Sequence, residues 1–167
     1  MASYESIAWQ ELSANTNVIN FTSIPQTYKD LKVIIAPMST GASDYAINMQ
    51  VNNDASASAY QTRSFYIYPT GLAAVALTQA WWDLYTGIGV HSRPTIMIVD
   101  LFRYADTSVW KTGQLQSGTK GTATNNNGYY TQSNMQFRST AAITSLKINN
   151  PSQDFVAGTT VGLYGIQ

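Results

Sequence analysis

Hydrophobic residues in this chain occur in short stretches separated by residues that are typical of turns. The clearest stretch covers residues 45–51, where every second residue, from Tyr45 to Val51, is apolar. Successive side chains of an extended strand point to opposite sides, so a period of two predicts a half-buried strand. Residues 52–54, Asn-Asn-Asp, favour a turn and end the pattern.

Further stretches of this kind predict more strands. They cover residues 18–21, 31–35, 64–68, 96–102, 108–112, 129–137, 143–148 and 159–166. The most apolar of them, 96–102, is expected at the centre of a sheet. Roughly eight to ten short strands with turns between them predict an all-β fold, an antiparallel β-sandwich or a barrel. The alanine-rich residues 72–82 are the one candidate for a helix, with an ordered loop as the alternative.

The last residues of the chain also have the pattern of a strand. A turn at residues 155–158 is followed by apolar residues that include Leu163, Tyr164 and Ile166. Chain ends usually fray unless contacts hold them. The final strand is therefore expected to lie within a sheet or within an interface with another subunit.

Length and composition indicate one domain, residues 1–167, with few charged groups. A domain of this length buries roughly 70% of its extended-chain surface, so it does not require a disulfide or a metal ion for stability. Charged residues make up 11% of the chain and the net charge is zero. This balance argues against binding to nucleic acid, because phosphates require concentrated positive charge.

No apolar run is long enough for a membrane-spanning helix, and the N-terminus lacks the pattern of a signal peptide, so synthesis in a cytoplasm is expected.

Few residues offer catalytic or metal-binding chemistry. The chain has no cysteine and one histidine, His91, which excludes thiol chemistry and argues against a zinc site. Asp83 and Asp100 are the candidates for a glycosidase pair, but scattered carboxylates are more often solvated. Residues 52–54 and 125–128 are better explained as turns than as calcium loops. No enzymatic activity, metal or cofactor is predicted.

Aromatic residues are the more informative candidates. Exposed rings serve as platforms for sugars, whereas buried rings belong to a core or a subunit interface. Neighbouring aromatics in a strand face opposite ways, so one of each pair is expected in the core. A role in core or interface is favoured, with glycan contact as the alternative, for Trp81, Trp82, Trp110, Tyr129 and Tyr130.

Three segments together resemble a family of β-sandwich structural proteins from tailed bacteriophages. They are Phe-Thr-Ser-Ile-Pro-Gln-Thr-Tyr-Lys-Asp-Leu at 21–31, Arg-Ser-Thr-Ala-Ala-Ile-Thr-Ser-Leu at 138–146, and the closing residues 155–166. The resemblance implies a jelly-roll-like virion protein, either a capsid decoration protein or a module of a tail fibre or tailspike. In the first segment, Tyr28 is expected to tuck its ring into the core and bond a backbone group. Asp30 is expected to accept amide hydrogen bonds at the same corner.

The leading hypothesis is a non-enzymatic capsid decoration, or cement, protein located in the virion. Its expected partners are further copies of itself, as a homotrimer, and the major capsid protein. Residues 1–12, with Tyr4, Ile7 and Trp9, are expected to form an anchoring arm whose removal leaves the fold intact. The alternative is a receptor-binding module of a tail fibre or tailspike, with tail proteins and host surface glycan as partners.

Overall fold

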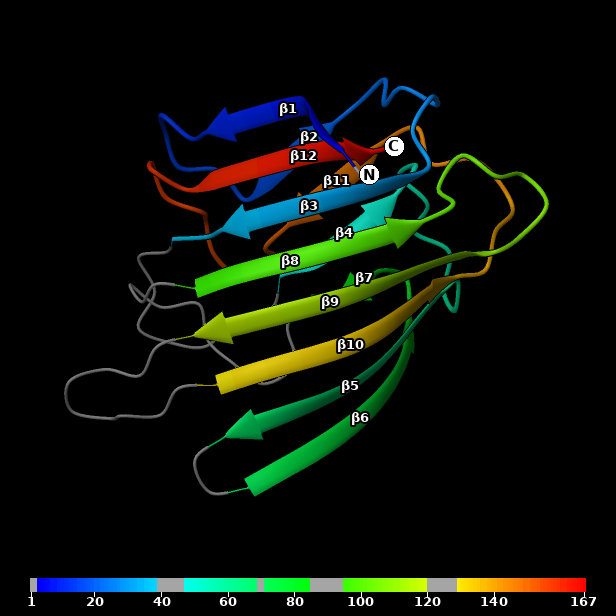
Figure 1. Cartoon of the computed structure of the whole chain (residues 1–167). Coiled ribbons are helices and arrows are strands. Elements are labelled where there is room, and N and C mark those ends of the chain that lie inside the picture. The colour runs from blue at the N-terminus through cyan, green and yellow to red at the C-terminus, as the bar shows by residue number, and fades with distance from the viewer. Residues whose placement is uncertain (1–2, 39–46, 69–70, 85–94, 120–128) are drawn as a thin grey trace.

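The structure, a computed structural model, describes residues 3–38, 47–68, 71–84, 95–119 and 129–167. Within these residues the chain forms twelve β-strands and no helix. The strands make two antiparallel sheets that pack face to face (Figure 1). The predicted all-β, antiparallel sandwich is therefore confirmed. Within the described residues there is likewise no helix long and apolar enough to cross a membrane.

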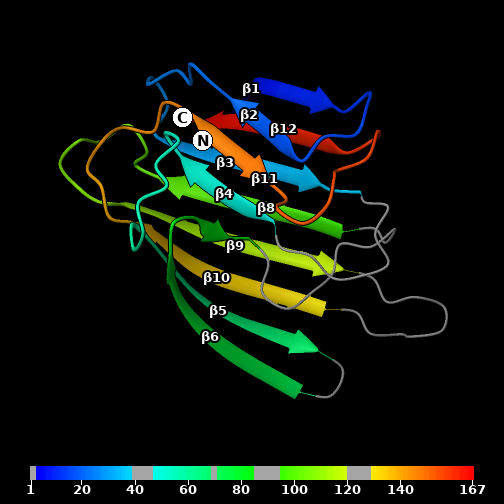
Figure 2. The same ribbon diagram turned by 180° about the vertical axis from the view of Figure 1, so that it is seen from behind.

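The two sheets differ in size. The large sheet has eight strands in the order β1 (Tyr4–Glu11), β12 (Thr160–Ile166), β3 (Asp30–Ala36), β8 (Thr95–Phe102), β9 (Lys111–Thr119), β10 (Tyr129–Phe137), β5 (Tyr60–Tyr68) and β6 (Gly71–Gln79). The small sheet has four strands in the order β2 (Val18–Phe21), β11 (Leu146–Asn149), β4 (Asn48–Val51) and β7 (Trp82–Asp83). Figure 2 shows the small sheet in front, where it covers only part of the large one.

The topology is that of a jelly roll with two added hairpins. β1 pairs with β12, β2 with β11, β3 with β8, and β4 with β7, so the chain follows one long hairpin folded over on itself. β5 and β6 are inserted between β4 and β7, and β9 and β10 between β8 and β11. All four inserted strands extend the large sheet beyond β8. The predicted jelly-roll-like arrangement is present, with more strands than expected.

The core lies between the sheets and ends in an aromatic cluster. Leu31, Val33 and other alternate residues of the central strands are fully buried. At the edge of the small sheet, Trp82 packs edge-on against Tyr60, whose ring stacks on Phe137 at 4.8 Å. The indole of Trp82 donates a hydrogen bond to the backbone carbonyl of Gln136 at 3.0 Å. This cluster joins the inserted strand β5 to the jelly roll.

Residues 22–29 form a corner between β2 and β3. Asp30 accepts a hydrogen bond from the backbone amide of Arg103 at 2.7 Å, which confirms its expected role. Tyr104 donates its hydroxyl hydrogen to the backbone carbonyl of Pro25. Tyr28 packs against the core, but its hydroxyl lies beside Glu5. Desolvation, together with that carboxylate, raises the pKa of Tyr28 above its ordinary value.

The alanine-rich segment is a strand and not a helix. Residues 71–79 form β6, which pairs with β5 over nine residues without a shift of register. Helix propensity is a weak preference that tertiary contacts override. Here the long strand β5 offers a complete set of backbone partners. The polar residues 114–119 are also in a strand, β9, which begins at Lys111 and not at residue 108.

The N-terminal segment is part of the large sheet, which corrects the expectation of an arm. Residues 4–11 form β1 and pair with β12, with one irregularity between Ser6 and Ala8. Ile7 and Ala8 pack against the core. Removal of residues 1–12 would therefore uncover β12 and damage the fold. The expectation for the last strand is confirmed, because β12 lies between β1 and β3 and Leu163 is fully buried.

Candidate interaction face

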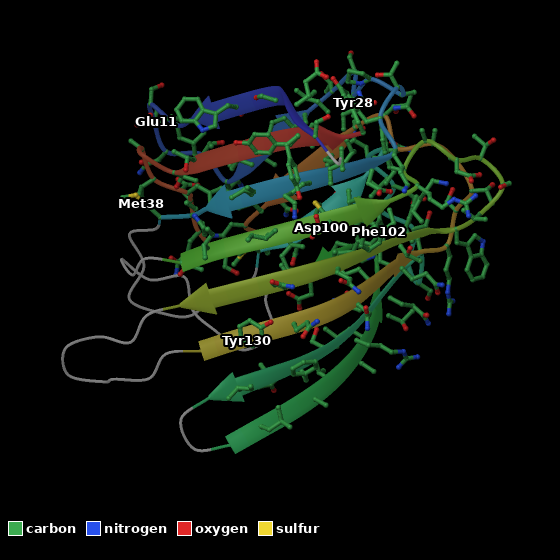
Figure 3. The ribbon with its side chains drawn as sticks, viewed as in Figure 1. Glu11, Tyr28, Met38, Asp100, Phe102 and Tyr130 are labelled. Atoms are coloured by element: carbon green, nitrogen blue, oxygen red, sulfur yellow. The ribbon has the colours of Figure 1, made fainter. Side chains whose placement is uncertain are left out.

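The large sheet has one covered face and one open face. Along β8, Met97, Val99 and Leu101 are buried toward the small sheet, whereas Ile96 and Phe102 are exposed on the other side. Neighbouring strands continue this alternation, so their outward side chains form one surface. We call this surface the open face. In Figure 3 it is turned toward the reader, with Tyr130 labelled at the start of β10 and Phe102 at the end of β8.

An apolar row crosses the inserted half of the open face. The strand register places Ile96 beside Gly118, Gly118 beside Tyr130, Tyr130 beside Ile67, and Ile67 beside Leu72. The exposed fractions of Ile96, Tyr130, Ile67 and Leu72 are 50%, 40%, 50% and 66%. Single exposed apolar residues are common, whereas exposed apolar residues that adjoin one another are typical of interaction sites.

Amide side chains fill the middle of the same half. We call this group the amide patch; its members lie on β5, β9 and β10 and are Gln61, Gln114, Gln116, Gln132, Asn134 and Gln136. None of their side chains forms a hydrogen bond with another residue that the structure describes. A shallow hollow of about 400 Å³ adjoins them, lined also by Arg63 and Phe102. The patch therefore presents unused donors and acceptors beside a cation and an aromatic ring.

The jelly-roll half of the open face carries aromatic residues and an ion pair. Tyr4 and Trp9 of β1 are largely exposed. Lys32 of β3 and Asp100 of β8 lie opposite each other and form an ion pair of 2.5 Å. The Lys32 ammonium also lies 5.8 Å from the centre of the Tyr4 ring. Because these charges neutralise each other, the face keeps an apolar character across β3 and β8.

A buried lysine holds the loop beside the open face. Lys111, the first residue of β9, is almost fully buried. Its ammonium donates hydrogen bonds to the backbone carbonyls of Asp106, Val109 and Thr140, the last two at 2.9 and 3.0 Å. Desolvation lowers the pKa of Lys111 below its ordinary value. The lysine thereby fixes the loop that carries Trp110, an exposed residue.

The outward surface of the small sheet is different in character. Its hollow of about 620 Å³ is lined almost entirely by polar side chains, from Asn17, Val18, Asn20, Thr22, Asn53, Lys147 and Asn149. No exposed large hydrophobic residue of the described chain belongs to the small sheet. The exposed aromatic and aliphatic residues thus concentrate on the large sheet.

The aromatic candidates do not gather at one site. Trp82 is fully buried in the core, so it is not accessible to a ligand or partner, and Trp81 beside it is half-buried. Tyr130 lies in the apolar row, whereas Trp110 lies at the opposite end of β9. The side chain of Tyr129 lies outside the described residues, as does His91. At the C-terminus, Tyr164 and Ile166 are outward and half-buried.

The two candidate carboxylates are also separated. Asp100 belongs to the open face of the large sheet and pairs with Lys32. Asp83 follows the inward-facing Trp82 on β7, so it points away from the core on the small sheet's side. A glycosidase requires two carboxyl groups that flank one bond, and these two do not. Within the described residues, no group of three or more potential metal ligands comes together.

The strand register, which sequence reasoning missed, creates both the apolar row and the amide patch. The sequence does contain a partial sign of the amide patch: Gln114 and Gln116 flank Leu115 and so lie on the same side of a strand. Gln132, Asn134 and Gln136 repeat that spacing in the next strand.

No family model matches this chain, and comparisons with the curated proteins and with the solved structures give no match.

Proposed function

We propose that this chain is a non-enzymatic structural subunit of a tailed-phage particle. In this proposal it is a capsid decoration protein that bridges subunits of the major capsid protein. The observation that carries the proposal is the open face, where exposed apolar side chains extend across strands of both halves of the large sheet. The resemblance of the three sequence segments supplies the phage context.

The contrast between the two outward surfaces supports binding through the large sheet. Interfaces between proteins are enriched in Tyr, Trp and Phe and depleted in charges at their centre. The open face carries Tyr4, Trp9, Phe65, Phe102 and Tyr130, and its central ion pair is internally neutralised. The small sheet presents amides and a lysine, which are compatible with solvent.

A pair of matched double variants tests the proposal. Ile96→Lys with Tyr130→Lys adds two positive charges to the apolar row. Asn20→Lys with Thr22→Lys adds the same charge to the small sheet. Asn20 lies on β2, Thr22 directly follows that strand, and both are exposed. Each purified protein is mixed with particles that lack it, and the bound amount is measured after sedimentation. The proposal predicts that only the first variant loses binding.

Loss of binding by both variants, or by neither, would contradict docking through the open face. Circular dichroism and thermal unfolding of both proteins first establish that each variant folds. The substituted side chains are exposed, so little change in stability is expected.

A second candidate function, recognition of a host surface glycan within a tail fibre or tailspike, is favoured by the hollow at the amide patch. Glycan hydroxyls require several hydrogen-bond donors and acceptors, and a ring such as Phe102 can stack on a sugar. Arg63 forms no ion pair with a described residue, so an acidic sugar is the preferred ligand. Binding to an array of acidic and neutral oligosaccharides tests this function. Glycan recognition at the amide patch predicts that Arg63→Gln loses binding to acidic oligosaccharides. Lys147→Gln, on the small sheet, should retain that binding.

A further inference from the structure

The edge strands of the two sheets differ in how they avoid pairing with other chains. Natural proteins protect edges by keeping them short or by adding charges, prolines or bulges. In the small sheet, the edge strand β2 has four residues and β7 has two. In the large sheet, β1 carries Glu5 and Glu11 and an irregularity between Ser6 and Ala8.

The other edge of the large sheet, β6, has none of these protections. Its nine residues, Gly-Leu-Ala-Ala-Val-Ala-Leu-Thr-Gln, include no charged residue and no proline. Its register with β5 is regular from Gly71 to Gln79. No strand of the described residues pairs with its outer side. A long, uncharged and regular edge is a template for another strand.

The side chains of β6 show what a partner strand would cover. Ala73, Val75 and Leu77 face the same side as the buried residues of β5, but each remains half-buried. Their neighbours across the strand pair, Thr62 and Ser64, are buried. An additional strand beside β6 would extend this inner layer and remove apolar surface from water.

The sequence of β6 is self-complementary about its central residue. In an antiparallel pair of two copies centred on Val75, each Ala73 lies opposite Leu77 and each Ala74 opposite Ala76. On the inner side, Val75 meets Val75 at the axis and the small Ala73 faces the larger Leu77. On the outer side, only alanines meet next to the axis. No pair brings like charges together, whereas cross-strand pairs of apolar residues stabilise a sheet.

We propose that β6 pairs antiparallel with β6 of a second copy of this chain, about a two-fold axis at Val75. The two large sheets then form one continuous sheet, and their open faces lie side by side. This pairing goes beyond the proposed function, because it concerns the free chain and does not depend on what the open face binds. It predicts a dimer or an assembly of dimers, whereas the hypothesis drawn from the sequence expects a homotrimer.

Charged substitutions at Val75, the residue on the axis, provide the first test. Val75→Lys and Val75→Glu each place two like charges directly opposite one another in the dimer, which destabilises the pair. Sedimentation velocity of the full chain should show a dimer for the wild type and a monomer for each variant. An equimolar mixture of the two variants should again form a dimer. Thr112→Lys, an exposed position on β9, is the control and should remain dimeric.

A single cysteine provides a second test that changes little in the fold. The chain contains no cysteine, so Val75→Cys introduces the only thiol. Mild oxidation should link two Val75→Cys chains, since the same residue from each copy meets at the axis, while Thr112→Cys should remain unlinked.

Three results would overturn the proposal. They are a wild-type protein that is monomeric or trimeric at every concentration measured, a dimer that persists in Val75→Lys, and a dimer in which Val75→Cys fails to cross-link. Binding to phage particles is scored separately with the open-face variants, so either proposal can fail alone.

Discussion

Replacement of Gly165 by alanine is predicted to destabilise the fold by about 1–3 kcal/mol, because the added methyl group has no space. A Cβ atom at Gly165 would lie well inside van der Waals distance of three ring carbons of Tyr28. β12, which carries Gly165, is paired with β1 and β3 on its two sides and has little freedom to move. The Tyr28 ring therefore has to leave its place in the corner.

The same substitution should behave differently when the ring is absent. In a Tyr28→Ala background, Gly165→Ala is predicted to be neutral or stabilising by roughly 0.5–1 kcal/mol, since alanine loses less backbone entropy than glycine. The sign of the effect thus changes with residue 28. A double-mutant cycle should give a coupling energy of at least about 1 kcal/mol between these two positions.

Urea unfolding followed by tryptophan fluorescence measures the four proteins of this cycle. Gly113→Ala is the control, because its Cβ would lie 2.7 Å from the backbone oxygen of Asp100, which no side-chain truncation removes. Tyr28→Ala should leave the cost of Gly113→Ala unchanged. If Gly165→Ala costs the same with and without the Tyr28 ring, the corner packing described above is wrong.

Three further predictions concern the titratable residues. Lys111→Met should lower the free energy of unfolding by about 2 kcal/mol, because three backbone carbonyls lose their hydrogen-bond donor. An unchanged urea midpoint would contradict a stabilising role for these hydrogen bonds. Burial raises the pKa of Tyr60 to about 12, so the stability that its neutral form contributes is present below pH 10 and is lost as the pH rises toward 12. In urea titrations at several pH values, Tyr60→Phe should reduce this loss of stability between pH 10 and 12. An equal loss in the variant and the wild type would contradict the role of Tyr60. Hydrogen bonds from Ser108 hold the pKa of Asp106 at about 2, so Ser108→Ala should raise that pKa toward 3.8 in an NMR titration, and no upward shift would dismiss the contact.

Local patterns in the sequence predicted several strands with nearly correct bounds. β2 and β10 have the bounds expected from the sequence, and β8 and β12 differ from expectation by one residue. β6 was mistaken for a helix candidate because alanine and leucine favour helices in isolation. Its strand conformation depends on β5, which supplies a partner for every residue from Gly71 to Gln79.

The open face could not be predicted, because it depends on contacts between distant segments. Tyr130 lies between Gly118 and Ile67, and nothing in the residues around Tyr130 indicates the second neighbour. The sequence did indicate that one residue of the Trp81–Trp82 pair enters the core. Which one does so is decided by β7, whose short pairing with β4 turns Trp82 inward.

The number of copies of this chain in purified phage particles directly tests the proposal that it decorates the capsid. Quantitative mass spectrometry gives this number relative to the major capsid protein of the same particles. A protein that bridges capsid subunits is expected at a copy number comparable with that of those subunits. Absence from the particles, or a copy number that matches the tail proteins, would contradict a role in decorating the capsid.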